Sequence, residues 1–311
     1  MSTSSSGGAK ARRKEFWLGF VFAGLGAVLF SAKAIVAKLT YRYGVDALIV
    51  IGFRMLLSLP FFALVGYMQA RMARRGRLAR LNWRESLQIV FLGFLGYYLS
   101  SYLDFLGLEY ISAGLERLIL FLSPTFVLLL SALYLKQAIS RGQWVALALS
   151  YLGVVFVFFQ DLSLSGDRVM LGSAFVMGSA LSYAVYLISS GVIIQRVGAT
   201  RLVAYAMSVS AGFSIAHFLA FKGLQGLAQP APVYWLSALH AVVHTVVPTF
   251  ITMWAVARIG APTTAQLGLL GPVSVLFLAG WLLDEPITAL QLVGTAFTLA
   301  GAVVLARMRR A

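Results

Sequence analysis

The sequence contains no cysteine, and only 11% of its 311 residues are charged. Without cysteine, disulfide bonds, thiolate metal sites and cysteine nucleophiles are excluded. The small charged fraction, against 60% hydrophobic residues, leaves too little polar surface to cover a soluble protein of this length. Nor does the sequence contain a Ser/His/Asp arrangement, a metal-ligand cluster, an ATP-binding P-loop or a glycine-rich dinucleotide loop. These absences argue against an enzyme and indicate a protein that is solvated by the bilayer.

The net charge of +15 does not indicate a nucleic-acid partner. Lys and Arg fall in short tracts between apolar runs, whereas a nucleic-acid-binding protein carries them on one continuous surface. The tracts lie at alternate joints: the N-terminal tail, Arg71 to Arg84, Lys136 with Arg141, Arg196 with Arg201, Arg258, and Arg307 to Arg310. Because short cytoplasmic loops of membrane proteins are enriched in these residues, we expect both chain ends in the cytoplasm.

Apolar runs follow one another through the whole chain. A membrane-spanning helix needs roughly 20 apolar residues. By that measure we expect ten helices, at 16–38, 46–69, 86–108, 112–134, 142–159, 170–194, 201–222, 233–257, 261–283 and 288–306. Glycines at the joints, including Gly260-Ala261-Pro262, set several of these boundaries. The first run resembles a signal peptide, but it continues through Ala37, which makes it long enough to span. The sequence therefore predicts an all-α integral membrane protein.

The second half of the chain repeats the first. Phe105 to Phe156 aligns without a gap with Met253 to Val304, and Pro124 meets Pro272 in this alignment. Because each unit has five spans, the second unit must cross the membrane in the opposite sense, and inverted repeats place a substrate site near the midplane. We expect a cytoplasmic basic tail at 1–15, a first five-helix repeat at 16–159, a linker at 160–169, a second repeat at 170–306 and a cytoplasmic tail at 307–311.

A longer motif in the second half runs from Ala261-Pro262 through Pro272, Leu283-Asp284-Glu285-Pro286-Ile287 and Gln291 to Gly294 and Gly301. Together with the ten spans and the duplicated halves, it resembles the EamA group of the drug/metabolite transporter superfamily over nearly the whole chain. In the first half, Lys136-Gln137 replace the acidic residue expected after the proline-bearing helix. The resemblance implies alternating-access transport of small organic solutes through a central cavity, and the aromatic and small residues look most similar to bacterial exporters of aromatic amino acids.

Polar and aromatic side chains in the middle of the spans are expected to line this cavity, because a polar group that faces lipid is costly. In the eighth span, His240 and His244 share one helical face, and in the third, Tyr98, Tyr102 and Phe105 share another. We assign substrate binding to Lys33, Tyr97, Tyr98, Ser101, Tyr102, Tyr183, Tyr186, His244, Thr245, Thr249 and Gln266. Core packing of the tyrosines, and a hydrogen bond from His244 to a neighbouring helix, stay open as alternatives.

Cations inside spans need a carboxylate or a route to water. Arg54 cannot lose its charge and is expected to find a carboxylate, whereas Lys33 has the alternative of extending to the outer surface. We expect an ion-pair network that closes the outer gate, with Trp254 as a gate or anchor near the cytoplasmic end; the network consists of Arg54, Asp104, Glu116 and Arg117. A solute carboxylate bound by Lys33 or Arg54 is the competing interpretation.

Three prolines fall near the middle of their spans: Pro124, Pro248 and Pro272. Proline removes a backbone hydrogen bond and favours a kink. We expect these positions to act as hinges, and the alternative is a fixed kink that only shapes the helix.

Together these observations predict an inner-membrane, multi-pass transporter that exports amino acids, aromatic ones favoured, or related small metabolites. Antiport of sugar phosphates or nucleotide sugars is the alternative within transport, and a membrane-embedded enzyme is the alternative from another class. The expected partners are a small-molecule solute and membrane lipid, without cofactor, metal or nucleic acid, and the chain is expected to act as a monomer. The sequence leaves open a proton as a further partner, the identity of the solute and the net direction of transport.

Overall fold

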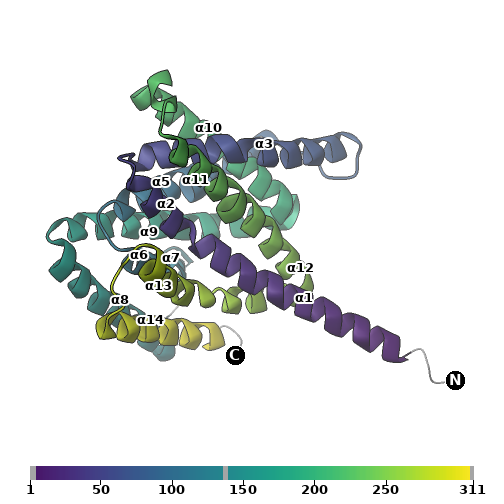
Figure 1. Cartoon of the computed structure of the whole chain (residues 1–311). Helices are drawn as coiled ribbons and strands as arrows, with labels where there is room; N and C mark the ends of the chain where they lie inside the picture. Colours follow the sequence, from purple (N-terminus) through teal and green to yellow (C-terminus); the bar gives the residue numbers. More distant parts are fainter. Residues whose placement is uncertain (1–4, 136–138, 309–311) are drawn as a thin grey trace.

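The computed structural model describes residues 5–135 and 139–308, with most of their side chains. All regular elements in these ranges are helical, as Figure 1 shows. In chain order they are α1 (Ser5–Ser31), α2 (Lys33–Tyr41), α3 (Ala47–Arg74), α4 (Trp83–Gly93), η1 (Phe94–Leu99), α5 (Ser100–Leu108), α6 (Ala113–Leu120), α7 (Ser123–Leu135), α8 (Arg141–Ser165), α9 (Arg168–Val197), α10 (Ala199–Lys222), η2 (Leu224–Leu227), α11 (Ala231–Ala241), η3 (Val242–Val246), α12 (Val247–Leu267), α13 (Leu270–Leu282) and α14 (Ala289–Met308).

The predicted class of all-α membrane protein is confirmed. Within the described ranges, eight helical stretches are long and apolar enough to cross a bilayer. Two shorter apolar helices follow them, at Leu270–Leu282 and Ala289–Val304. Because a segment in lipid must satisfy its backbone hydrogen bonds internally, a helix is the form that such apolar stretches can take. The chain is therefore a multi-pass membrane protein.

Several of the long stretches are interrupted helices. A break at Ala32 separates α1 from α2, and a non-helical turn at 121–122 separates α6 from α7. The segments η1 and η3 are π-helical, and each lies between two α-helices. A π-helical turn holds more residues than an α-helical turn, so the residues after it point in directions that a period of 3.6 does not predict.

Two predicted boundaries are wrong. The fifth span does not end at 159, because α8 continues to Ser165. In this extension, the carboxylate of Asp161 accepts hydrogen bonds from the backbone and the hydroxyl of Ser112. Nor does the chain turn at Gly260-Ala261-Pro262, because α12 continues to Leu267. Glycine and proline are tolerated inside membrane helices, where neighbouring groups satisfy the freed backbone atoms.

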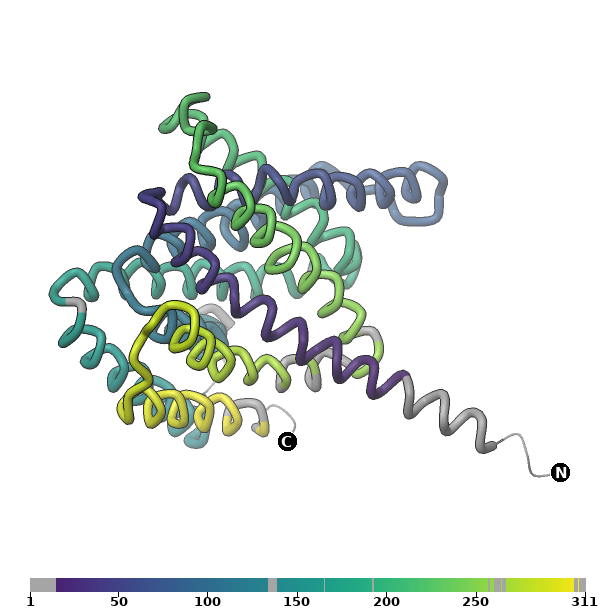
Figure 2. Tube along the Cα trace, in the orientation of Figure 1, coloured from purple at the N-terminus to yellow at the C-terminus, as the bar shows by residue number. Residues whose placement is uncertain are grey.

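Long helix pairs join distant parts of the sequence. α1 packs along α12, α3 along α10, α5 along α9, and α8 along α14. Figure 1 shows the first pair as two diagonal helices that lie side by side and run in opposite directions, and the last pair at the bottom of the view; Figure 2 follows the same pairs along the chain trace. The shorter helix α6 packs against α2, α8, α9 and α13, and α2, α3, α5 and α6 carry the buried charged residues Lys33, Arg54, Asp104 and Glu116.

Candidate functional site

A buried salt bridge joins the first and third spans. Lys33 is the first residue of α2, directly after the break at Ala32, and its Nζ lies 2.5 Å from Oδ2 of Asp104 on α5. Lys33 is 8% exposed and Asp104 is 2% exposed. An unpaired charge is costly in an apolar interior, so each of these groups stabilises the burial of the other. Lys33 therefore does not extend to the surface, which was the alternative that the sequence left open.

The ring of Phe105 lies beside this salt bridge and has three basic groups around it. Its centroid lies 5.6 Å from Nζ of Lys33, 4.9 Å from Cζ of Arg54 and 5.3 Å from the centroid of the His240 ring. Arg54 forms no salt bridge among the described residues and instead uses the ring face as a partner. Its Nε and Nη2 and both ring nitrogens of His240 are buried without a hydrogen-bond partner. The interior therefore holds N–H donors that are available to an anion.

Helix α6 carries a carboxylate and a guanidinium to different neighbours. Glu116 is completely buried, and neither of its carboxylate oxygens has a donor. Its carboxyl group interacts electrostatically with that of Asp104. Arg117 extends toward α13, where a Cβ placed on Gly271 would lie 2.7 Å from Nη2 of the arginine. A glycine at this position leaves the space that the guanidinium occupies.

Three tyrosines form an aromatic wall next to these charges. The hydroxyl groups of Tyr97 and Tyr186 are 3.0 Å apart, and the rings of Tyr183 and Tyr186 stack at 5.5 Å. A Cβ on Gly96 would lie 2.3 Å from the Tyr186 ring, so glycine allows η1 to approach α9 this closely. Tyr183 interacts electrostatically with Arg117. The wall therefore adjoins the charged groups and presents hydroxyl groups as well as ring faces.

The structure separates Tyr98 and Tyr102 from this wall. The Tyr98 hydroxyl lies 2.9 Å from Nδ1 of His217 on α10, and the Tyr102 ring centroid lies 4.9 Å from that of the same histidine. Ser101, between them in sequence, is partly exposed. The prediction that Phe105 shares one face with Tyr98 and Tyr102 is wrong, because the rings of Tyr98 and Tyr102 pack against His217, whereas the Phe105 ring packs against the basic groups.

The polar stripe of the eighth span is largely hydrogen-bonded to backbone. Nδ1 of His244 lies 2.7 Å from the carbonyl oxygen of Leu29 on α1. The hydroxyl of Thr245 donates to the carbonyl of His240, and that of Thr249 donates to the carbonyl of Thr245. His244 is therefore hydrogen-bonded to a neighbouring helix, which was one of the two alternatives that the sequence left open. His240 is the member of the stripe with free nitrogens.

Carboxylates hold the helix N-termini at one end of the molecule. Glu285 accepts from the backbone N–H of Ala113 with both oxygens at 3.1 Å and lies 3.2 Å from Nζ of Lys38. Glu109 accepts from the backbone N–H of Ala47 at 2.5 Å. Together with Asp161 on Ser112, we call these three acidic residues the carboxylate latch. Each one satisfies a backbone donor that the first turn of a helix leaves free.

Further contacts close the same end. They are Nζ of Lys222 to Oδ2 of Asp46 at 2.5 Å and Nη2 of Arg42 to the carbonyl of Leu283 at 3.0 Å. Burial raises the pKa of Glu109 above its usual 4.5, against the opposing effect of the Ala47 N–H. This end is therefore tied by contacts between segments that are far apart in the sequence.

At the other end the ion pairs join pairs of adjacent helices. Arg258 on α12 lies 2.9 Å from Glu15 on α1, and Arg196 on α9 lies 2.7 Å from Glu85 on α4. Trp254 is 53% exposed, with its ring centroid 6.1 Å from that of Phe22. The assignment of Trp254 as a gate or an anchor stays a prediction.

The three prolines follow interruptions of the helices. Pro124 is the second residue of α7, Pro248 is the second residue of α12, and Pro272 lies in the first turn of α13. Proline in the first turn after a non-helical break gives up no intrahelical bond, as at Pro124 and Pro272, whereas Pro248 follows the π-helical η3 directly. Their role as hinges stays a prediction. The side chain of Gln266, which the sequence assigned to the site, lies outside the part that the structure describes.

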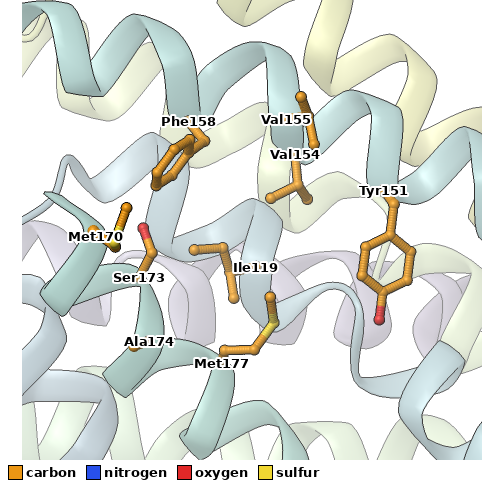
Figure 3. A pocket seen from close by; sticks show the side chains of 9 residues that line it. All are labelled: Ile119, Tyr151, Val154, Val155, Phe158, Met170, Ser173, Ala174 and Met177. Carbon is orange, nitrogen blue, oxygen red and sulfur yellow. The ribbon is translucent and has the colours of Figure 1, made fainter.

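The cavity in Figure 3 lies apart from the charged residues. It has a volume of about 260 Å³ and lies between α6, α8 and α9. Its walls are apolar apart from Ser173 and Tyr151. A cavity without charged groups offers nothing to recognise a charged solute, so we place the candidate site at Lys33, Arg54, Asp104, Glu116 and Arg117. The described residues contain no group of three or more His, Asp or Glu side chains that could hold a metal ion.

Three functional residues were not assigned from sequence. Phe105 was recognised only as part of an aromatic face, and His240 only as a member of the histidine stripe. Glu285 was part of the second-half motif without a role. Its sequence signal was an acidic residue directly after an apolar run, which is a position from which a carboxylate can reach a neighbouring helix N-terminus.

Comparisons with known proteins show the family and the fold. The EamA-like transporter family matches residues 17–159 and 170–307. An uncharacterized transporter of Bacillus subtilis, YcbK, is 30% identical over 296 residues, which are 92% of this chain and 91% of the relative. An uncharacterized transporter of Archaeoglobus fulgidus is 26% identical over 74% of this chain and 81% of its own. A solved crystal structure superposes with a TM-score of 0.62 at 15% identity, covering 94% of this chain and 99% of its own, and this likeness concerns the fold alone.

Proposed function

Because the chain belongs to the EamA-like transporter family, we propose that it exports amino acids, with aromatic ones favoured, by alternating access. The family and the transporter-named relatives already make it a membrane transporter of small solutes and not an enzyme. The choice of solute, the outward direction, the location in the inner membrane and the action as a monomer belong to the proposal. A proton is proposed as a second partner.

The mechanism that we propose uses ten spans in two inverted five-helix repeats, with both chain ends in the cytoplasm. Support comes from irregularities that recur at one spacing. The π-helical segments η1 and η3 begin at residues 94 and 242, which have the same separation as Pro124 and Pro272. The break at 121–122 corresponds, to within one residue of this spacing, to the one at 268–269. Recurring breaks at matching depths are what two related halves would need to rock against each other.

One observation favours an amino acid as the solute. The buried site combines charges of both signs, three cations and two carboxylates, with the aromatic wall beside them. A zwitterion carries a carboxylate for Arg54 or Arg117 and an ammonium group for Asp104 or Glu116. Tyr97, Tyr183 and Tyr186 offer ring faces to a planar side chain.

An organic phosphate is the second candidate, since the cations outnumber the carboxylates and Arg54 has free N–H donors. Counterflow separates the two. Purified protein in liposomes loaded with unlabelled solute should accumulate labelled phenylalanine or tyrosine from outside at equal pH on both sides. Exchange of glucose 6-phosphate in place of any amino acid would refute our assignment. If neither solute is exchanged, the protein transports neither of them. An empty-liposome control excludes leakage.

A further inference from the structure

The two carboxyl groups at the centre of the site lack donors for most of their oxygens. Lys33 occupies Oδ2 of Asp104. Three oxygens remain buried without a hydrogen-bond donor: Oδ1 of Asp104 and both carboxylate oxygens of Glu116. Two ionised carboxylates that face each other in an apolar interior repel each other, and neither can donate a hydrogen bond. A hydrogen bond between the two groups would need a proton on one of them.

The neighbouring groups do not supply this missing partner. Of the helices around α6, α2 brings Lys33, which is held by Asp104, and α9 brings Tyr183, which interacts electrostatically with Arg117. On α6 itself, Nη2 of Arg117 lies in the space left by Gly271 of α13.

The remaining neighbours are occupied or face other groups. Asp161 of α8 is bound by Ser112, and Gln291 of α14 lies against Gly114. Arg54 of α3 lies on the Phe105 ring, and His240 of α11 lies at the same ring. Neither Arg54 nor Arg117 forms a salt bridge with Glu116 among the described residues, so the cations around the site leave its oxygens without a donor.

We propose that Asp104 and Glu116 share one proton in the empty transporter, and that the ammonium group of the solute replaces this proton when it binds. An ammonium group has three N–H donors, and three oxygens lack one. The solute keeps its own charge, its carboxylate takes the free N–H groups of Arg54 or Arg117, and the proton leaves to water on the side to which the site is open. This inference rests on the proposed function, because it takes an amino acid as the solute.

Exchange at a single site has a fixed stoichiometry. Either one proton or one solute occupies the carboxyl pair, so each solute that leaves the cell is replaced by one proton that enters. The solute is a zwitterion with no net charge, and each cycle therefore moves one positive charge inward. An inside-negative membrane potential then drives export even when the pH is equal on both sides.

The decisive experiment measures proton release on binding. Titration calorimetry of L-phenylalanine into the purified full-length protein is run at one pH in phosphate and in imidazole, because the two buffers differ in ionisation enthalpy. We expect about one proton released for each solute bound, following the one-for-one exchange at the carboxyl pair. Glu116→Gln should bind roughly tenfold to a hundredfold more weakly, since one charge-assisted hydrogen-bond acceptor is lost, and should release no proton. Asp167→Asn, which changes an exposed carboxylate at the α8–α9 joint, should behave as wild type.

Binding by the wild-type protein without proton release would overturn the inference, whatever the variant does. Release of a full proton by the Glu116→Gln variant would also overturn it and move the exchanged proton to His240. A potassium diffusion potential in liposomes gives the second measurement, and export that does not respond to it contradicts the exchange. With any of these three results, counterflow at equal pH would persist and the proposed function would stand. If no amino acid binds or exchanges at all, the proposed function itself is lost.

Discussion

Replacing Gly153 by alanine tests how closely α8 and α14 must approach. A Cβ at this position would lie 2.3 Å from the carbonyl oxygen of Gly294 and 2.3 Å from Oγ1 of Thr298. From the other helix, a Cβ at Gly294 would lie 2.5 Å from the carbonyl oxygen of Gly153. A methyl group needs more than about 3 Å from such an oxygen, so the helices must move apart by about 1 Å, because backbone atoms cannot turn aside.

The size of the effect follows from two opposing contributions. Overpacking of a tight contact costs roughly 1–3 kcal/mol, whereas alanine in place of glycine inside a helix favours folding by up to about 1 kcal/mol. Gly212→Ala in α10 is the matched control, since a Cβ there meets nothing within 4 Å and only the favourable contribution applies. Because the favourable contribution is common to both variants, they should differ by the overpacking cost of roughly 1–3 kcal/mol, with Gly153→Ala the less stable, which corresponds to a difference in Tm of roughly 2–12 °C.

Thermal unfolding in detergent, followed by tryptophan fluorescence, measures this difference. Wild type should lie between the two variants. Equal Tm values for both variants, or a higher value for the Gly153→Ala variant, would show that α8 and α14 do not touch at these glycines. Cross-linking between engineered cysteines on the two helices then gives their spacing directly, and the chain offers no native cysteine to interfere.

Three further predictions concern the charged groups. Lys33→Met should destabilise the protein by about 3–5 kcal/mol, because Asp104 is left buried without its partner; adding Asp104→Asn should restore most of the Tm without restoring flux, and an additive loss would count against the pair. Burial raises the pKa of Glu109 above 4.5, so the protonated carboxyl group stabilises the folded protein fully below pH 4.5, and this stabilisation is lost as the pH rises through the raised pKa. The Tm of the wild type should therefore fall over this range of pH, and the Tm of Glu109→Gln should change less. Parallel curves of Tm against pH would refute this prediction. Glu285→Ala should raise the labelling of an engineered cysteine at the latch end roughly tenfold, because Ala113 loses a charge-assisted hydrogen bond; unchanged labelling would mean that Glu285 does not hold this end closed.

The spans could be predicted from sequence because hydropathy is a local property. Their partners could not. Lys33 and Asp104 were each recognised as costly groups in the interior, but the salt bridge between them depends on how α2 packs against α5. Tyr98 and Tyr102 were expected to share one face with Phe105, but they pack against His217 of α10 while Phe105 packs against the basic groups, and these contacts depend on how the helices are arranged. Gly260-Ala261-Pro262 carried every signal of a turn, yet the surrounding helices keep it helical.

The carboxylate latch couples the opening of this end of the protein to local unfolding of helix ends. The amides of Ala47 and Ala113 begin helices α3 and α6, and the acids that cap them, Glu109 and Glu285, belong to other segments. Separation of these segments therefore frays the first turn of a helix at the same moment. Deuterium uptake at these two amides would therefore report how often the segments separate, both at rest and during turnover, without a chemical label on the protein.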